Sequence, residues 1–180
     1  MSSLSLRCTL TGFERIYQVN NPTPLLYNHL STLINDSSWK WWFTGFSDAE
    51  STFYISIRRD NTYKLKWKIS LSFAIKLHIR DIGILYFIKK QLGIGIINTS
   101  GTFCHYQFRD MQGLGMIIEH FHNYPLISLK SVDFLIFKNV FELIKRGEHL
   151  HLMGIQNIVA LKANQNRGLS NLLKIAFPNV

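Results

Sequence analysis

The sequence predicts an α+β domain in which helices cover one face of an antiparallel sheet while the other face remains in water. Along residues 39–180 the spacing of hydrophobic residues predicts, in order, a helix, a hairpin, a helix, a second hairpin and several helices. In residues 64–78, the longest alternating run, apolar side chains alternate with lysines, serines and a histidine. An antiparallel sheet with one buried and one solvated face gives this pattern.

The composition is that of a folded basic protein. The 180 residues are 47% hydrophobic and carry a formal net charge of +9, so the chain can bury a core and favours a polyanionic partner, with nucleic acid ahead of a membrane. No uncharged apolar run approaches the ~18 residues that a membrane span needs. Cys8 and Cys104 lie far apart, in no metal-ligand spacing.

Residues 1–38 differ from the rest of the chain. They contain Pro22 and Pro24, several Asn and Ser residues and no sustained period. We expect a leader or poorly ordered extension over residues 1–38 and a single domain over residues 39–180.

The first expected helix contains the run WFTGFSDAESTF at residues 42–53. Gly45 and Ala49 lie four residues apart, so another helix can approach this side closely. Asp48 and Glu50 stand near its C-terminal end, where the helix dipole disfavours exposed carboxylates by about 0.3–1 kcal/mol each. We therefore expect a positive group nearby.

Two hairpins and the remaining helices follow. Alternating residues 53–58 and 65–77 predict two strands joined through a loop at Asn61. The second hairpin is expected to pair residues 94–98 with 102–109, around Ser100 and Gly101. Helices are expected at residues 80–92, where Gly93 ends the helix, and at about 111–122, 130–147, 154–165 and 169–176.

Four segments resemble the LAGLIDADG homing endonucleases. The run at 42–53 resembles their signature, and SFAIKLHIRDIGIL (72–85), HFHNYPLISLK (120–130) and GEHLHLMGIQNIVALKANQNRGLS (147–170) resemble the first repeat of two-motif, organellar intron-encoded members. The resemblance covers roughly residues 39–180. It implies an αββαββα unit with a curved antiparallel sheet that lies in the DNA major groove and helices on the other face.

The resemblance also implies a function. It implies a site-specific endonuclease that makes a metal-dependent double-strand break in double-stranded DNA when paired with a second LAGLIDADG domain, in the same longer chain or another subunit. Glu50 would be the catalytic acid and a ligand of Mg²⁺ or another divalent cation, with the carbonyl of Ser51 beside it. Asp48 has either a helix-end role or a metal contact. The motif-helix interface would use Gly45, Phe46 and Ala49.

The solvated sheet face supplies the expected DNA contacts. Lysines there are suited to phosphates, and hydroxyl, amide and guanidinium groups to base edges, although an ordinary solvated sheet face is the alternative interpretation. The expected DNA-binding residues are Tyr54, Ser56, Arg58, Lys64, Lys66, Lys68, Ser70, Ser72, Lys76, Gln107 and Arg109, with Lys130 at the start of a helix.

Two residues depart from the family pattern. Ser51 stands where the family usually has glycine, and its Cβ would restrict a positive φ. Ala74 stands where many relatives carry glutamine. Both departures predict weakened cleavage, and they leave three alternatives open: an intron RNA splicing maturase, a nucleic-acid-binding module without cleavage, and a decayed reading frame.

The residues of the expected leader also predict where in the cell the protein is found. The stretch GFERIYQVNNP (12–22) resembles leaders of organellar intron-encoded members, which are made inside the organelle, while Arg7, Arg15 and a shortage of acids also fit a mitochondrial transit peptide. Both interpretations predict a mitochondrial protein.

Overall fold

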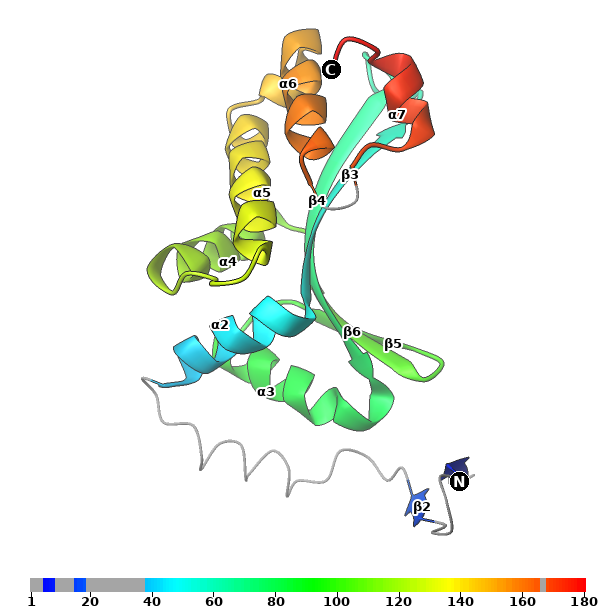
Figure 1. Cartoon of the computed structure of the whole chain (residues 1–180), viewed down its shortest axis with the longest axis vertical. Helices are drawn as coiled ribbons and strands as arrows, with labels where there is room; N and C mark the ends of the chain where they lie inside the picture. The colour runs from blue at the N-terminus through cyan, green and yellow to red at the C-terminus, as the bar shows by residue number, and fades with distance from the viewer. Residues whose placement is uncertain (1–4, 9–14, 19–37, 166–167) are drawn as a thin grey trace.

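The computed structural model describes residues 5–8, 15–18, 38–165 and 168–180. Its main sheet has four antiparallel strands in the order β3-β4-β6-β5. The strands are β3 (Ser51–Arg59), β4 (Trp67–His78), β5 (Ile96–Ser100) and β6 (Phe103–Phe108). Helices α4, α5 and α6 lie along one side of the long β3–β4 ribbon (Figure 1).

The helices agree with the sequence prediction to within about a turn. The motif helix α2 spans Ser38–Glu50 and passes directly into β3. Gly93 ends α3 in the left-handed region, at a φ of 72°, as the sequence predicts. The other helices are α3 (Ile82–Leu92), α4 (Met111–Asn123), α5 (Lys130–Lys145), α6 (Leu152–Ala163) and α7 (Asn171–Ala176), with 3₁₀ turns at Ile79–Asp81 and Glu148–Leu150.

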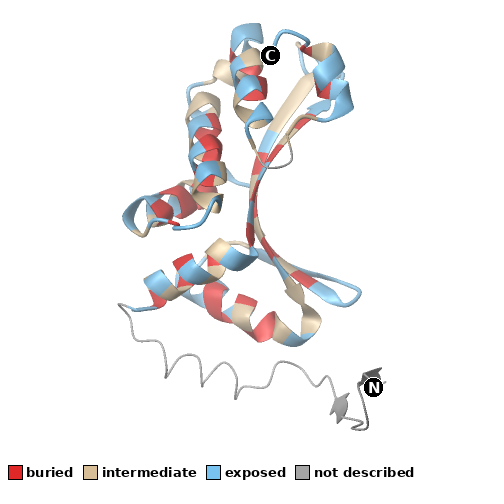
Figure 2. Ribbon diagram, viewed as in Figure 1, coloured by how far each residue is buried: buried red, intermediate tan, exposed pale blue. Residues whose placement is uncertain are grey.

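Phenylalanine rings join the motif helix to the sheet. Phe43 of α2, Phe53 of β3, Phe73 of β4 and Phe121 of α4 are all buried (Figure 2). The ring centroids of Phe53 and Phe73 lie 5.3 Å apart, and those of Phe43 and Phe121 lie 5.9 Å apart. Truncating one such ring to alanine typically costs about 3–5 kcal/mol, so this cluster fixes the position of α2 on the domain.

The loop of the first hairpin corrects the sequence prediction. Lys64 and Lys66 lie in the loop rather than on the strand, because β4 begins at Trp67. The backbone N–H of Lys66 donates to the Tyr63 carbonyl at 2.8 Å, and Lys66 has a φ of 59°. Thr62 binds the Asp60 carboxylate through its hydroxyl and its backbone N–H, at 2.6 and 3.1 Å. These local bonds stabilise a turn that interrupts the alternating pattern.

Within the predicted leader, β1 (Ser5–Cys8) and β2 (Arg15–Gln18) form an antiparallel pair. The rest of residues 1–37 lies outside the described residues, so the division of the chain at residue 38 stays a prediction. Among the described residues, no helix has the length and apolar character needed to cross a membrane.

Candidate active site and nucleic-acid interface

Lys130, at the start of α5, binds the C-terminal end of α2. Its ammonium donates to the carbonyls of Ser47, Ala49 and Ser51 at distances of 3.2, 3.3 and 2.6 Å. These bonds use all three ammonium donors, and the positive charge faces the negative end of the helix dipole. Lys130 is therefore the positive group that the helix-end acids lead one to expect. In this geometry it caps the motif helix, and the DNA contact expected from the sequence stays a prediction.

Asp48 attaches the same helix end to the turn before α5. Its carboxylate accepts hydrogen bonds from the Ser128 hydroxyl at 2.5 Å and from the backbone N–H groups of Ser128 and Ile127 at 3.0 and 3.2 Å. Burial raises the pKa of Asp48, but these bonds and the charge of Lys130 outweigh it and leave the pKa below its usual value. Of the two roles left open for Asp48, the geometry supports the helix-end role.

Glu50 is the last residue of α2 and is exposed. Its carboxylate makes no hydrogen bond or ion pair with any other described residue. Burial lowers the pKa of Lys130, while the charges of Asp48, Glu50 and Asp133 oppose that shift, so Glu50 lies within the field of this lysine. A free carboxylate suits a hard, oxygen-preferring cation. In the described part of the chain, no three or more metal-ligating side chains lie close enough together to hold a metal ion. At the end of α2, Asp48 is occupied by its hydrogen bonds, so Glu50 is the carboxylate that a cation could bind.

Ser51 begins β3 and is buried. Its hydroxyl donates to the Ser47 carbonyl at 2.6 Å, and its own carbonyl accepts from Lys130. Lys66 is the only non-glycine residue with a positive φ in the described part of the chain, so the backbone strain expected at Ser51 does not arise. A carbonyl oxygen has two lone pairs, so the metal contact expected of Ser51 stays a prediction beside the bond from Lys130.

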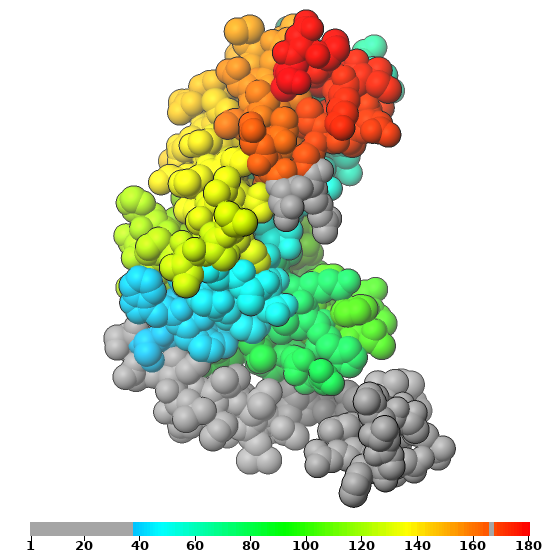
Figure 3. Space-filling view, viewed as in Figure 1, coloured from blue at the N-terminus to red at the C-terminus, as the bar shows by residue number. Residues whose placement is uncertain are grey.

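The outer face of α2 is an open strip without charge. Trp41, Gly45 and Ala49 are exposed along it, and a Cβ built on Gly45 meets no atom within 4 Å. Phe46 is half-buried and stacks on Trp42, with 5.1 Å between ring centroids. In Figure 3 the helix (cyan) lies on the molecular surface, bordered by the start of α5 (yellow). This face is therefore accessible to a partner, and the motif-helix interface through Gly45, Phe46 and Ala49 stays a prediction.

The cations on the β3–β4 part of the sheet lie on its uncovered face. Arg58 is directly opposite Lys68 in the register. Like charges directly opposite one another destabilise a sheet. The Asp60 carboxylate lies in the field of both cations, since the bonds from Thr62 lower its pKa most and the charges of Lys68 and Arg58 lower it further. A phosphate bound at this pair would relieve the remaining repulsion. The predicted hydroxyl residues lie on the same face, with Tyr54 opposite Ser72 and Ser56 opposite Ser70.

The remaining predicted contacts have different surroundings. The Nζ of Lys76 lies 4.0 Å from the centroid of the exposed Phe103 ring, closer than the 5.7 Å between the Nζ of Lys68 and the Tyr63 ring, so both charges have an aromatic neighbour. Gln107 is on β6, opposite Ala74 of β4. Arg109 is exposed just after β6.

His120 connects α4 to the motif helix, a role that the sequence did not indicate. Its Nε2 lies 3.1 Å from the Thr44 hydroxyl, which in turn donates to the Tyr124 carbonyl at 3.0 Å. The hydroxyl proton is used there, so Nε2 is the donor in the first bond. Burial, followed by the charge of Lys40, lowers the pKa of His120 to about 4, so the imidazole is neutral at pH 7.

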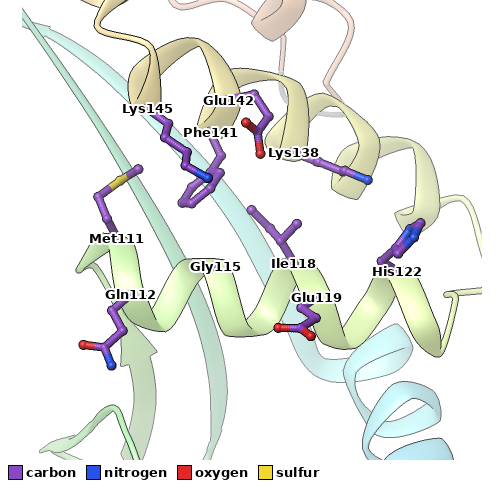
Figure 4. Close-up of a pocket in the computed structure, with 10 residues that line it drawn as sticks. All are labelled: Met111, Gln112, Gly115, Ile118, Glu119, His122, Lys138, Phe141, Glu142 and Lys145. Atoms are coloured by element: carbon purple, nitrogen blue, oxygen red, sulfur yellow. The ribbon is translucent and has the colours of Figure 1, made fainter.

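A groove of about 580 Å³ runs between α4 and α5 (Figure 4). Gly115, Ile118 and Phe141 are among its apolar lining residues, and Glu119 and Lys138 among its charged ones. None of the predicted site residues lines this groove, so it is separate from the end of α2.

The similarities of this chain to known proteins point to one family. A family model described as LAGLIDADG endonuclease matches residues 43–141. The "Probable intron-encoded endonuclease 3" of Neurospora crassa is 32% identical, with 97% of this chain and 36% of that protein aligned. An uncharacterized 50.9 kDa protein in ND4 intron 1 of Podospora anserina is 38% identical, over 78% of this chain and 31% of that protein.

Solved structures have the same fold. The crystal structure of the LAGLIDADG meganuclease I-CpaMI bound to uncleaved DNA superposes with a TM-score of 0.75 at 41% identity. The match covers 78% of this chain and 48% of that one. This chain therefore spans about a third of the length of the curated relatives and about half of the solved relative.

Proposed function

Because the chain belongs to the LAGLIDADG endonuclease family, we propose that it is one half of a site-specific DNA endonuclease and contributes Glu50 to a shared, metal-dependent active site. The observation that carries the proposal is the position of Glu50, a free and exposed carboxylate at the end of a helix whose outer face is open and uncharged. Its neighbour Asp48 is tied to Ser128, so Glu50 is the acid left for chemistry.

A divalent cation fits this position. Endonucleases of the family are generally dependent on a divalent metal, and Mg²⁺ commonly takes one or two protein carboxylates and keeps several waters. Glu50 would supply one of these ligands. When bound, such an ion stabilises charge on the attacking and leaving oxygens of the phosphodiester. Lys130 holds the backbone that precedes and follows Glu50, and thereby fixes where this carboxylate is presented.

A second LAGLIDADG unit is the proposed partner at α2. One acid leaves the site incomplete, and Gly45 and Ala49 leave room for the close approach of a second motif helix. Beside this strip, Ile127 and Leu129 are 92% and 87% exposed. Their segment is fixed to Asp48 through the N–H groups of residues 127 and 128. They would extend the apolar contact beyond the helix.

Double-stranded DNA is the proposed substrate, and the uncovered sheet face would bind it. Arg58 and Lys68 would contact phosphates there, while Tyr54, Ser56, Ser70, Ser72 and Gln107 face the same side. The loop residues Lys64 and Lys66 would meet the DNA from the hairpin tip. A mitochondrial location is proposed because relatives are encoded in introns, one of them in ND4.

The test compares the chain alone with the chain joined to a second LAGLIDADG unit. The substrate is a plasmid that carries the uninterrupted host-gene sequence, incubated with and without Mg²⁺. We expect the joined protein to linearise the plasmid only with Mg²⁺, and the single chain to leave it supercoiled. Binding to the host intron transcript, without any cleavage of DNA by the joined protein, would instead favour the maturase alternative.

A further inference from the structure

The uncovered face of the sheet has two chemically different halves. The β3–β4 half carries Arg58 and Lys68. The edge strand β5 has no charged residue, and its outward positions are Ile96, Asn98 and Ser100. Exposed edge strands usually carry charges that prevent pairing with other chains. This edge instead has an isoleucine that is 61% exposed, so an apolar side chain is available there for contact with a ligand.

Ile96 has a specific neighbour. The register pairs Ile96 with Gln107 on β6 and pairs Gln107 with Ala74 on β4. Side chains paired in this way have Cβ atoms about 4.5–5.5 Å apart. Ala74 is short, so the amide of Gln107 has an aliphatic side chain on one flank and only a methyl group on the other. The sheet thus presents a branched apolar group beside an amide in one row.

This row matches the edge of an A·T base pair in the major groove. In adenine, N7 accepts a hydrogen bond from the NH₂ of a glutamine amide, and the N6 amino group donates one to the amide oxygen. Thymine presents its C5-methyl group, which takes apolar contacts. We propose that Ile96 and Gln107 form an adenine–thymine reading pair, in which Ile96 packs on a thymine methyl and Gln107 binds an adenine of the same or the next base pair. The proposal rests on the proposed DNA-binding function of this sheet face.

Thymine and uracil provide a direct test, because uracil lacks the C5-methyl group. Sites bound by the chain joined to a second LAGLIDADG unit are first selected from a library of randomised duplexes. Each thymine that faces this chain in the selected site is then replaced by uracil. At one thymine we expect the affinity of the parent to fall about fourfold, which corresponds to one buried methyl group. Ile96→Ser should show no difference between the two bases at that position. Ile96→Leu, which keeps an apolar tip, should retain part of the difference.

Gln107→Ala should lower the preference for adenine at the same or the adjacent base pair by at least fivefold. Leu150→Ser is the matched control, because Leu150 is 58% exposed in the 3₁₀ turn before α6, and this variant should keep both preferences. If the parent binds the selected duplex but no thymine is sensitive to uracil, or if Ile96→Ser remains sensitive, the reading pair is disproved and the proposed function stands. If the parent protein joined to a second LAGLIDADG unit binds no duplex, the proposed function itself fails.

Discussion

Replacing Lys130 with methionine should destabilise the domain, because it removes the ammonium that binds the end of α2. Methionine keeps most of the aliphatic length but cannot donate to the carbonyls of Ser47, Ala49 and Ser51. These oxygens would lose their partner beside two acids at the negative end of a helix dipole.

The expected loss follows from these three bonds. Hydrogen bonds to charged groups contribute about 1.5–3 kcal/mol each when they are well buried, but Lys130 is only half-buried. Taking about 1 kcal/mol per bond gives a loss of roughly 3 kcal/mol, which in a domain of this size lowers the melting temperature by about 6–12 °C.

The assay is urea unfolding of the parent, Lys130→Met and Lys138→Met. Lys138 lies on the same helix and is also half-buried, but it makes no hydrogen bond to α2. Its replacement should change stability by no more than about 0.5 kcal/mol. If the two variants unfold at the same urea concentration, the capping role of Lys130 is refuted.

Three further outcomes are expected. Ala49→Leu should weaken association with a second LAGLIDADG unit by about 1–3 kcal/mol through overpacking; unchanged association, measured by titration calorimetry, would place the interface elsewhere. Replacing both Arg58 and Lys68 with alanine should reduce the slope of log Kobs for DNA binding against log salt by about 0.9 per lost phosphate contact. Fluorescence anisotropy measures this slope, and a slope equal to that of the parent would argue against phosphate contact at this pair. His120 has an ordinary pKa near 6.5 when unfolded but about 4 when folded. As the pH falls, the unfolded state therefore binds a proton before the folded state does, and the free energy of unfolding should decrease from pH 6.5 towards pH 4. The expected decrease is about 1–2 kcal/mol, because His120 is only partly buried. It should be absent in His120→Gln.

The sheet and the motif helix could be predicted because their patterns are local. Residues 51–59 and 67–78 alternate between buried and outward positions over most of their length, as a strand with one wet face requires. The same alternation continues through Lys64 and Lys66 in the sequence, and here it misled. The bonds from Thr62 to Asp60 and the positive φ of Lys66 favour a turn, and binary patterning does not detect such bonds.

The candidate site could be predicted only in part. Glu50 is visible in the sequence because it ends an apolar run, and the same observation required a positive group nearby. The identity of that group was not readable, since Lys130 lies 79 residues from Ser51 and its partners are backbone carbonyls, which have no residue signature. For the same reason the sequence did not reveal the bond between Thr44 and His120, which are 76 residues apart.

The family pattern also suggested a defect at Ser51 that the geometry does not contain. Its φ is not positive, because α2 passes directly into β3 and residue 51 is an ordinary strand residue. Ser51→Gly should therefore not increase cleavage. Ala74 does leave space beside Gln107 on the uncovered face, so Ala74→Gln remains the informative substitution for weakened activity.

The most direct test of the account is cleavage by Glu50→Gln in the chain joined to a second LAGLIDADG unit. Glutamine keeps the shape of the side chain but removes the charge that holds the metal. The variant should unfold at the same urea concentration as the parent and bind the target duplex with nearly the same affinity. Its Mg²⁺-dependent linearisation of the target plasmid should be at least 100-fold slower, in line with the loss of a metal's charge stabilisation. Cleavage at the rate of the parent would contradict the assignment of Glu50 as the acid that this chain contributes.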